Sequence, residues 1–588
     1  MKPGTRRRRR LALLSAVVLS LTFAVPVSAH GGDHRPRPKP KPDPIVNVQV
    51  LAFNDYHGHL EATTPGTVGT VPAGGSEYLA THLQALRSGH RNTVTVAAGD
   101  LIGGTPFLSG IFHDEPSVES LNALGLDVSS VGNHEFDQGV KELRRMQYGG
   151  CHPVDGCYFP DDPYPGADFP WLAANVVKEG TNRTVLPPFW IKKFQGVKVG
   201  FIGMTLEDTP SLVAQSGIEG WDFKDEVETA NRLVPKLRRL GVQAIVVLLH
   251  EGGLQTGTFD ECVGISGPIV EIQAGLHPEI DLLVTGHTHQ PYNCVMSDPA
   301  GQPRHVTSAF SFGRIISEID LPINKRTGEV VRADVTVVNH LVDQTVAKDP
   351  TQTAIIAKWK ALSDVVGNKV VGKVTATIAR ATTASGSEDR GSESSLGNMI
   401  ADAQLWATLG NGAQLALMNP GGVRADLRFP QATGEGDGAV TYAEAFNVQP
   451  FGNLMSTMPM SGAQIKAALA QQCQPSTSSR PFLHLGVSAG VTYDLSKTIS
   501  VDAAGKSTCT AITVSNLKLN GVDVADGTTY LVTVNNFLAD GGDNFAAFKD
   551  TPVASRIGGG IDLDMLIAYL GSQGPIAPPG TDRVNELP

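Results

Sequence analysis

Positive charge is scarce in this sequence. Its 588 residues include 47 lysines and arginines against 58 aspartates and glutamates, so the formal net charge is −11 at pH 7. Proteins that bind DNA or RNA need a basic surface, because contacts to the phosphate backbone dominate their affinity. We therefore expect no nucleic acid polymer as a partner, and an anionic small molecule would have to be bound by a local group of cations.

Long apolar runs are absent after residue 25. Residues 11–25 are apolar, follow five arginines and precede the small residues Val27-Ser28-Ala29, which is the pattern of a secretory signal peptide. This run is too short for a membrane span. We predict a signal peptide over residues 1–29, a Pro-rich tether over residues 30–44, and a secreted protein without a membrane anchor. The arginines leave both the general and the twin-arginine export routes open.

Cysteines are few, but their even number of six favours disulfides in an exported chain. Six cysteines allow fifteen connectivities. Neighbours along the chain favour three local pairs, Cys151 with Cys157, Cys262 with Cys294 and Cys473 with Cys509. Free buried thiols are the alternative.

The chain is too long for one hydrophobic core. Strand-like apolar runs alternate with helical stretches through residue 345, at residues 46–53, 93–98, 128–131, 244–249 and 280–284. This alternation predicts a layered α/β domain over residues 45–345. We expect a linker over residues 346–369 that contains a bridging helix from residue 349 to 367. Residues 370–588 are expected to form a second domain, with a helix over 396–409 and strands near 414–418, 490–495 and 530–534.

Each of the five strand-like runs in the first domain is followed by residues of types that can bind metal ions. The five strand ends read Asn54-Asp55-Tyr56-His57, Gly99-Asp100, Gly132-Asn133-His134-Glu135, His250-Glu251-Gly252-Gly253 and Gly286-His287-Thr288-His289. Carboxylates, an amide and imidazoles are the mixed set that divalent first-row metals bind. Five unrelated structural loops are the alternative, but such groups on the loops of a rigid scaffold usually carry function.

In order and spacing, these five motifs resemble those of the calcineurin-like binuclear metallophosphatases. The contexts Asn54-Asp55-Tyr56-His57-Gly58-His59-Leu60 and Gly132-Asn133-His134-Glu135-Phe136-Asp137 are similar to the secreted 5′-nucleotidase and UDP-sugar hydrolase branch. The resemblance implies an α/β protein with an N-terminal four-layer α/β/β/α metallophosphatase domain. It also implies a C-terminal α+β nucleotide-binding domain.

The resemblance implies two divalent metal ions, with zinc, manganese, cobalt or iron as candidates. It assigns the first metal to Asp55, His57 and His289, the second to Asn133, His250 and His287, and a bridging position to Asp100. His134 would contact the phosphoryl and leaving-group oxygens, while Asp137 would fix its tautomer and orientation.

Three residues near these motifs are not assigned to the metals. We interpret His59 as a supporting or packing residue. Glu135 and Glu251 are candidates for orienting ligands from behind, with exposed or salt-bridged carboxylates as the default interpretation.

Three stretches of the second domain resemble the C-terminal domain of the same family. The implied substrate-binding residues are Arg390, Asn419, Arg424, Phe451, Asn453, Phe537 and Asp543. The resemblance places the base between the rings of Phe451 and Phe537, for which core packing is the alternative. Asn453 would reach the base edge, and Asp543 would bind ribose hydroxyls.

The resemblance assigns phosphate oxygens to Arg390 and Arg424. The family often carries a second arginine in the loop before the helix at 396, and here only Arg390 stands at the motif spacing.

The sequence therefore predicts a secreted, metal-dependent 5′-nucleotidase, a phosphoric monoester hydrolase that acts as a monomer on nucleoside 5′-phosphates. Nucleoside di- and triphosphates and UDP-sugars are further candidate substrates. One alternative is a 2′,3′-cyclic-nucleotide 2′-phosphodiesterase with 3′-nucleotidase activity, whose relatives tend to stack bases on tyrosines. The other is a non-catalytic nucleotide-binding protein, which the intact metal motifs disfavour.

Overall fold

The computed structural model describes residues 44–587, except residues 63–65, 214, 384–385, 431–435, 477 and 503–505. The expected signal peptide and all but the last residue of the expected tether lie outside the described residues. Among the described residues, no helix has both the length and the apolar composition needed to cross a membrane.

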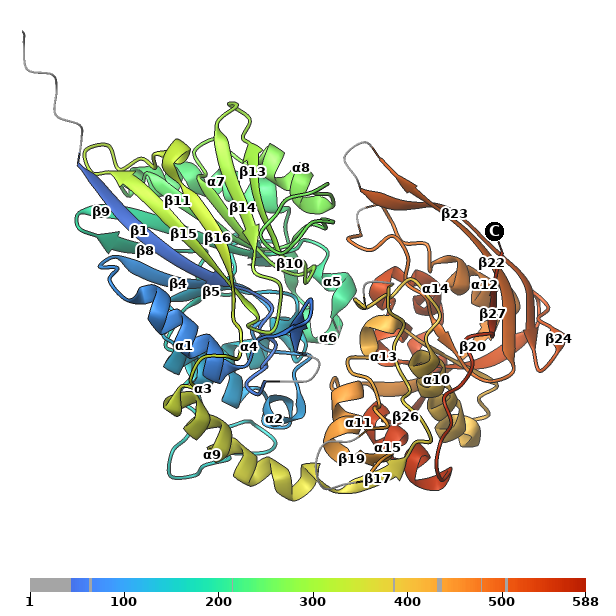
Figure 1. Cartoon of the computed structure of the whole chain (residues 1–588). Helices are drawn as coiled ribbons and strands as arrows, with labels where there is room; N and C mark the ends of the chain where they lie inside the picture. Colours follow the sequence, from blue (N-terminus) through green and yellow to red (C-terminus); the bar gives the residue numbers. More distant parts are fainter. Residues whose placement is uncertain are drawn as a thin grey trace, which may run out of the picture. The chain divides into compact units, whose positions relative to one another are not determined.

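Two six-stranded sheets dominate the first half of the chain (Figure 1). The first has the order β16 (Thr336–Leu341), β15 (Ile315–Asn324), β1 (Ile45–Phe53), β4 (Thr93–Ala98), β5 (Val128–Ser130) and β6 (Trp171–Leu172). The second has the order β13 (Tyr292–Ser297), β14 (Pro303–Ser308), β12 (Leu282–Thr285), β11 (Ala244–His250), β9 (Val197–Thr205) and β8 (Phe189–Phe194). The run expected at 280–284 thus begins two residues later than predicted.

Within each sheet, the strands that precede the candidate metal motifs run parallel to one another. In the first sheet, β1, β4 and β5 are parallel, with Phe53 opposite Ala97 and Ala98 opposite Ser130. In the second, β11 and β12 are parallel, with Leu249 opposite Thr285. Because parallel strands end at the same edge of a sheet, their polar loops gather there.

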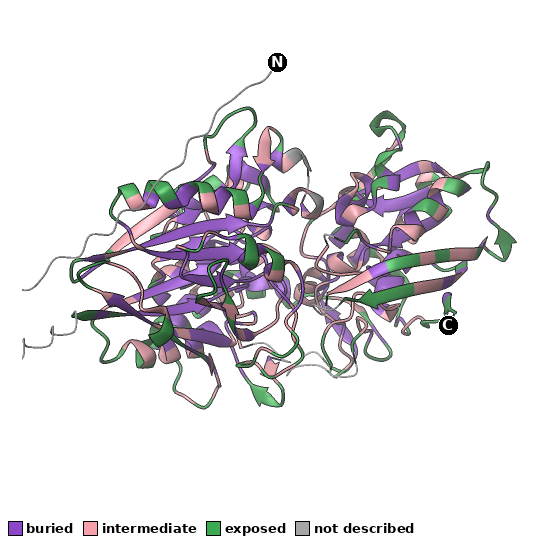
Figure 2. Cartoon of the chain, turned by 90° about the horizontal axis from the view of Figure 1, so that it is seen from above, coloured by how far each residue is buried: buried purple, intermediate pink, exposed green. Residues whose placement is uncertain are grey.

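The first half has four layers. Apolar side chains fill the space between the two sheets, including Val48, Val96 and Val246. Helices α1 (Ser76–Arg87), α3 (Glu115–Leu124) and α4 (Gly139–Tyr148) share one hydrophobic cluster with the first sheet, and α7 (Glu226–Arg239) and α8 (Pro268–Gly275) share another with the second sheet. Figure 2 shows the strands buried and the outer faces of the helices exposed. The predicted α/β/β/α layering is confirmed.

Helix α9 (Pro350–Gly367) occupies the expected position of the bridging helix. Asp349 caps its N-terminus by accepting a hydrogen bond from Gln352 N, and Pro350 stands at its first position, where no hydrogen-bond donor is needed. The sequence pattern predicts one apolar face with Ile355, Ile356, Trp359 and Leu362; the first three are buried, whereas Leu362 is exposed. The domain boundaries around this helix stay a proposal.

The second half combines two larger sheets with helices. One sheet has the order β21 (Gly486–Val487), β18 (Leu415–Met418), β25 (Thr529–Asn535), β20 (Leu454–Ser461) and β26 (Ile557–Ile561). The other has the order β24 (Val522–Asp523), β23 (Ser507–Leu519), β22 (Val491–Val501) and β27 (Val584–Glu586). The helices include α10 (Ser395–Thr408), α11 (Tyr442–Val448), α12 (Gly462–Ala470), α13 (Asn536–Ala539), α14 (Ala546–Lys549) and α15 (Asp562–Ser572). This arrangement agrees with the predicted α+β domain.

The described chain also contains shorter elements. They include β2 (Thr67–Val68), β3 (Val71–Pro72), α2 (Phe107–Gly110), the 3₁₀ turn η1 (His134–Phe136), β7 (Val176–Lys178), α5 (Thr209–Leu212), α6 (Gln215–Ile218), β10 (Trp221–Phe223), β17 (Val370–Lys373) and β19 (Ala439–Thr441). The three predicted disulfides, Cys151–Cys157, Cys262–Cys294 and Cys473–Cys509, are present.

Candidate functional site

The loops after β1, β4, β5, β11 and β12 pack against one another at one edge of the two sheets. Asp55 N donates a hydrogen bond to Gly99 O over 3.1 Å. A Cβ atom on Gly99 would lie 2.6 Å from Gly132 N and 2.7 Å from His250 Nδ1, so only glycine permits this approach. The glycines of two motifs thus bring the polar residues of three loops together.

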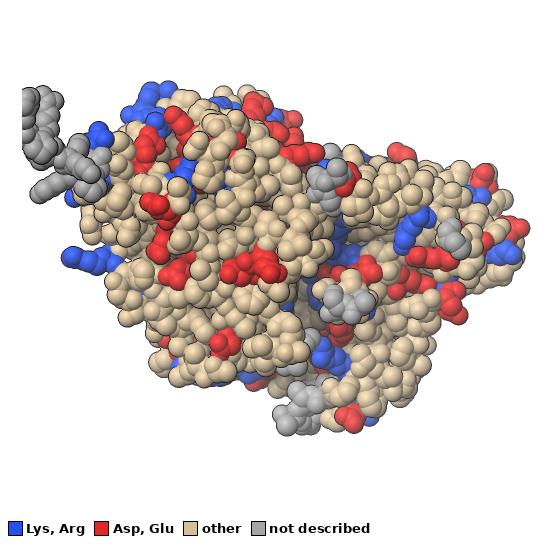
Figure 3. Space-filling model, turned by 45° about the horizontal axis from the view of Figure 1, so that its top comes forward, with Lys and Arg blue, Asp and Glu red and all other residues tan. Residues whose placement is uncertain are grey.

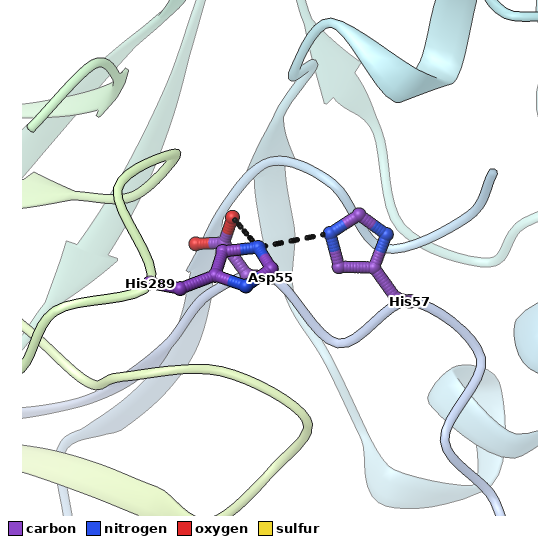
Figure 4. A group of neighbouring side chains, drawn as sticks. All are labelled: Asp55, His57 and His289. Atoms are coloured by element: carbon purple, nitrogen blue, oxygen red, sulfur yellow. Dashed lines mark hydrogen bonds and ion pairs between the residues drawn. The ribbon is translucent and has the colours of Figure 1, made fainter. Parts of the chain in front are cut away.

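One group of candidate ligands comprises Asp55, His57 and His289 (Figure 4). His289 Nε2 lies 3.2 Å from Asp55 Oδ1 and 3.2 Å from His57 Nε2. Asp55 and His57 are fully buried, whereas His289 lines a cavity. The two imidazole nitrogens therefore converge beside one carboxylate oxygen.

A second group comprises Asp100, His250 and His287, with the Asn133 amide beside it. His250 Nε2 lies 2.9 Å from Asp100 Oδ2, and His287 Nδ1 lies 3.1 Å from Asn133 Oδ1. The same Asp100 oxygen lies 3.5 Å from His57 Nε2 in the first group. Asp100 therefore stands between the two groups, where the sequence motifs place a bridging ligand.

The hydrogen bonds of these imidazoles test whether cations fit the site. His57 Nδ1 lies 2.7 Å from Gly103 O and His250 Nδ1 lies 2.7 Å from Ala98 O, and a carbonyl can only accept a hydrogen bond. In its neutral form, each ring therefore presents the lone pair of Nε2 to the Asp100 carboxylate. Electron pairs that face one another at this distance need a proton or a cation between them, so the donor set fits divalent metals.

Burial and the Asp100 carboxylate together shift the pKa values of His57 and His250. Burial lowers the pKa of His57 well below its ordinary value, which keeps this ring neutral. Burial also opposes the charge on His250, but the Asp100 carboxylate outweighs it and raises the pKa of His250 to about 10. A cation is thus favoured electrostatically between the two residues.

Five of the seven candidate ligands have a left-handed backbone. Positive φ angles occur at Asp55 (49°), His57 (45°), Asp100 (51°), His287 (71°) and His289 (51°). This conformation is uncommon for residues with a side chain, and such strain concentrates at functional sites. The turns direct the ligand side chains back toward the gap between the loops.

Glu135 and Glu251 differ from the default interpretation, because both are buried, with 3% and 6% of their surface exposed. The Glu135 carboxylate accepts hydrogen bonds from the backbone N–H groups of Asp100, Leu101 and Gly132. It therefore fastens the Asp100 loop to the Asn133 loop. Glu251 accepts a hydrogen bond from Gly252 N, and burial raises the pKa of Glu251 to about 8.

His134 lies next to the candidate metal ligands without belonging to either group of three described above. Its Nδ1 is 2.7 Å from Asp137 Oδ2, so the carboxylate holds the ring and leaves Nε2 for other contacts. Its ring packs edge-on against His57 at 5.0 Å between centroids and parallel to Phe451 at 5.8 Å. His59 instead stacks on Phe312 at 3.9 Å, which agrees with the predicted packing role.

A cavity of about 600 Å³ joins these residues to the second half of the chain. Its walls include Asp100, Asn133, His134, Asp137, His287 and His289 from the first half. They also include all seven substrate-binding candidates, Arg390, Asn419, Arg424, Phe451, Asn453, Phe537 and Asp543. Basic and acidic side chains are mixed over the face seen in Figure 3, with basic atoms visible in a recess.

Two aromatic rings of the cavity are only half-buried. Phe451 lies parallel to His134, and the Arg424 guanidinium is 5.7 Å from its ring. Phe537 lies over the backbone of Gly542, where a Cβ atom would come within 2.5 Å of the ring. Phe537 also packs against the hydrophobic core of the second half, so core packing accounts for part of its surface, and the stacking role of both rings stays a prediction.

The polar candidates are linked by hydrogen bonds. Asn419 Nδ2 donates to Asp543 Oδ2 over 2.9 Å, and Asn535 Nδ2 donates to Asn419 Oδ1 over 2.9 Å. Asn453 Nδ2 donates to Asp562 Oδ2 over 3.1 Å, which leaves its oxygen for a ligand. These bonds orient the amides before any ligand arrives.

Sequence reasoning missed two residues that line the cavity and one glycine near it. Arg480 and Glu388 both line it, and Glu388 Oε1 lies 3.2 Å from Arg390 Nε. Burial opposes ionisation of Glu388, but Arg390, Arg480, Arg380 and Arg424 together hold its pKa well below the ordinary value. A Cβ on Gly104 would lie 3.4 Å from Arg424 Nη2 and 3.5 Å from His134 Cε1, so this glycine keeps the space between them open.

Two groups of buried imidazoles and carboxylates, at the edge of an α/β/β/α sandwich and open to an arginine-lined cavity, define a phosphoesterase of the metallophosphatase class. Residues 48–291 match the calcineurin-like phosphoesterase family, and residues 370–550 match the 5′-nucleotidase C-terminal domain. The chain belongs to this family of 5′-nucleotidase-like metallophosphatases, and it is a hydrolase.

Named relatives differ in how much of their length the chain matches. It is 33% identical to cell wall protein Lmo0130 of Listeria monocytogenes over 90% of this chain and 67% of that protein. It is 29% identical to endonuclease YhcR of Bacillus subtilis over 90% of this chain, but spans only 40% of that protein. A 5′-nucleotidase of Vibrio cholerae is 26% identical over 95% of this chain and 96% of its own length.

Among solved structures, a 5′-nucleotidase precursor from Thermus thermophilus has the same fold. The TM-score is 0.73 at 24% identity, over 92% of this chain and 99% of that one.

Proposed function

We propose that this protein is a secreted, metal-dependent 5′-nucleotidase that hydrolyses nucleoside 5′-phosphates to nucleoside and phosphate. One observation carries the proposal. A single cavity of about 600 Å³ has four of the seven candidate metal ligands, Asp100, Asn133, His287 and His289, at one part of its wall and two half-buried phenylalanines with Arg390 and Arg424 at another. A volume of this size suits a mononucleotide. The name of the Vibrio cholerae relative supports the same substrate class.

The proposed metal centre holds two divalent cations. Asp55, His57 and His289 would bind one, Asn133, His250 and His287 the other, and Asp100 both, as the distances within each group allow. When bound, such a pair of cations neutralises phosphate oxygens and lowers the pKa of a water molecule. Zinc, manganese, cobalt and iron all suit this set of ligands.

The protein's own side chains then position and protonate the substrate. Asp137 accepts the Nδ1 proton of His134, so Nε2 is the atom that would give a proton to the leaving ribose oxygen. Arg424 lies close to His134 across Gly104, where it would bind an oxygen of the cleaved phosphate.

Contacts to the base and the ribose would make the cavity selective for nucleotides over other phosphate esters. Phe451 and Phe537 would stack on the base, and Asn453 would use its free oxygen at the base edge. Asp543, held by Asn419, would accept hydrogen bonds from the ribose hydroxyls. We propose Arg390 as a further phosphate ligand, because it lines the cavity beside Gly421.

Secretion is part of the proposal. Three disulfides in one chain are typical of proteins that fold in an oxidising compartment. We further propose that the mature protein is a monomer without a membrane anchor. Gel filtration with light scattering of the exported protein should give the mass of one chain.

Product analysis with and without a chelator tests the activity. The substrates are AMP, 3′-AMP, 2′,3′-cyclic AMP, UDP-glucose and a DNA duplex, with products separated by chromatography. Chelator-sensitive release of adenosine from AMP, well above release from 3′-AMP, is the expected result. Preference for the cyclic and 3′ esters would instead assign a cyclic phosphodiesterase, and cleavage of DNA alone would assign a nuclease. Binding of AMP without hydrolysis under any divalent metal would leave a nucleotide-binding protein.

A further inference from the structure

Two arginines of the cavity, Arg424 and Arg480, form no close ion pair among the described residues. In the part of the chain that the structure describes, no carboxylate forms an ion pair with the guanidinium of Arg424 or Arg480. The other cavity cations are paired, Arg390 with Glu388 at 3.2 Å and Lys497 with Glu586 at 2.9 Å. Both side chains are half-buried in the cavity wall, so their guanidinium groups are available to an anionic ligand. Arg424 already has a proposed role, whereas Arg480 has none.

The backbone around Arg480 is fastened to the substrate-binding residues. Gln474 N donates to Pro481 O over 3.0 Å, and Gln474 Nε2 donates to Asp543 O over 3.0 Å. On the other side, His484 N donates to Arg390 O over 2.7 Å. These hydrogen bonds connect the two ends of the segment that carries Arg480 to Asp543 and Arg390. The backbone on both sides of Arg480 is therefore fixed next to the cavity.

The charges around Arg480 locate it within the cavity. Burial and the neighbouring Arg390 lower the pKa of Arg480 to about 10. Arg480 in turn contributes to the low pKa of His287, after burial and His250. Its other charged neighbours are Glu388 and Asp543. Arg480 thus lines the same cavity as the candidate metal ligand His287 and the proposed ribose ligand Asp543, and it interacts electrostatically with both.

Arg424 occupies a different place. It contacts the ring of Phe451 and faces His134 across Gly104, beside the group that would protonate the leaving oxygen. The two arginines therefore lie in different parts of the cavity, Arg424 beside His134 and Arg480 toward Asp543.

We propose that Arg480 binds the phosphate group adjacent to the one that is cleaved, so that the cavity favours nucleoside diphosphates and triphosphates over monophosphates. This inference rests on the proposed nucleotidase function and assigns its phosphate-chain preference. The cavity wall carries four cations, Arg390, Arg424, Arg480 and Lys497, and five carboxylates, so its positive charge is concentrated at the arginines rather than spread over the whole wall. Arg480 also supplies the second cation that the loop before α10 lacks, from a segment about 90 residues further along the chain.

Substitution of Arg480 combined with substrates of different chain length tests this role. Arg480→Gln removes the charge and keeps much of the shape, Arg480→Lys restores a charge without the fork of donors, and Arg239→Gln on the exposed end of α7 is the charge-matched control. Release of phosphate from AMP, ADP and ATP is measured for each, with terminal cleavage checked by chromatography.

We expect Arg480→Gln to lower kcat/KM for ADP and ATP by about 10- to 100-fold, as expected for loss of a charged hydrogen bond, and for AMP by less than about 3-fold. Arg480→Lys should recover part of the loss, and Arg239→Gln should match the parent. Equal losses on AMP and ADP, or no loss on either, would overturn the proposal.

Binding measurements separate this inference from the nucleotidase proposal. If the parent protein cleaves no nucleotide, the nucleotidase proposal fails, and calorimetric titration with ADP and adenosine still examines Arg480. Weaker binding of ADP by Arg480→Gln with unchanged binding of adenosine would support the phosphate contact. Equal weakening of both ligands would show that the substitution disturbs the cavity as a whole and would refute it.

Discussion

Replacement of Glu135 should damage the metal centre, although this residue is not one of the proposed ligands. Its carboxylate is buried and accepts three backbone hydrogen bonds, two at Oε2 from Asp100 N and Gly132 N and one at Oε1 from Leu101 N. Glu135→Gln can keep the two bonds at one oxygen, but its amide nitrogen would face the N–H of Leu101. Glu135→Ala leaves all three donors without an acceptor.

The number of backbone N–H donors that lose their acceptor sets the expected loss of stability. A buried donor left unsatisfied costs about 1–3 kcal/mol, so Glu135→Gln should lose about that much and Glu135→Ala more. Each kcal/mol lost from the free energy of unfolding should lower the midpoint of thermal unfolding of the first half by about 2–4 °C. Residues that support metal ligands typically change metal affinity by about 10- to 100-fold, and we expect a loss in this range.

Scanning calorimetry and competition with a chromogenic chelator measure the two quantities on the same preparations. Glu179→Gln removes an equivalent charge at an exposed position and serves as the control. We expect the order parent, Glu135→Gln, Glu135→Ala in both metal affinity and midpoint, with Glu179→Gln equal to the parent. A Glu135→Ala protein with the parent's metal affinity and unfolding midpoint would refute the view that this carboxylate joins the ligand loops.

Three other predictions concern the roles of Asp100 and His134, the binding of the nucleobase and the pH dependence of stability. Asp100→Ala should lose metal, whereas His134→Ala should keep its metal but lose about 10²–10⁴-fold in kcat; elemental analysis with AMP turnover checks both, and full metal occupancy in Asp100→Ala would argue against bridging. Phe537→Ala should raise KM for AMP by about 5- to 150-fold, since stacking contributes about 1–3 kcal/mol, and an unchanged KM would remove the ring from the base site. Burial raises the pKa of Glu226 to about 7 from an ordinary 4.5, so the folded state binds this proton more tightly and loses up to about 3 kcal/mol as pH rises through that window. Glu226→Gln should therefore gain stability over the parent at pH 8 but not at pH 4, and a pH-independent difference between their melting midpoints would contradict the raised pKa.

The parts of the site that could be predicted from sequence share a local origin. Strand-like runs were followed at once by Asp, Asn or His, and parallel strands of one sheet end at one edge, so the residues after β1, β4 and β5 had to lie near one another. The same logic applied to His250 and His287 in the second sheet. Layering followed from the alternation of strand and helix patterns.

The missed parts depend on long-range neighbours. Arg480 stands in a serine-rich loop with no motif around it, and its proximity to Arg390 arises only through folding. In the sequence, Glu388 is one acidic residue among several in a polar stretch. Only the folded chain brings it near Arg380, Arg390, Arg424 and Arg480. The burial of Glu135 could not be inferred either, because a turn that follows a strand is ordinarily exposed. Positive φ angles at five candidate ligands leave no signature in the residue types themselves.

Metal titration coupled to turnover tests the central claim most directly. Protein freed of metal with a chelator is supplied with increasing amounts of manganese or zinc, while hydrolysis of AMP and bound metal are measured on the same samples. We predict no adenosine without metal and a rise in turnover that saturates at two bound ions per chain. Full turnover without metal or with a single bound ion, or two bound ions without any release of adenosine from AMP, would contradict a binuclear 5′-nucleotidase.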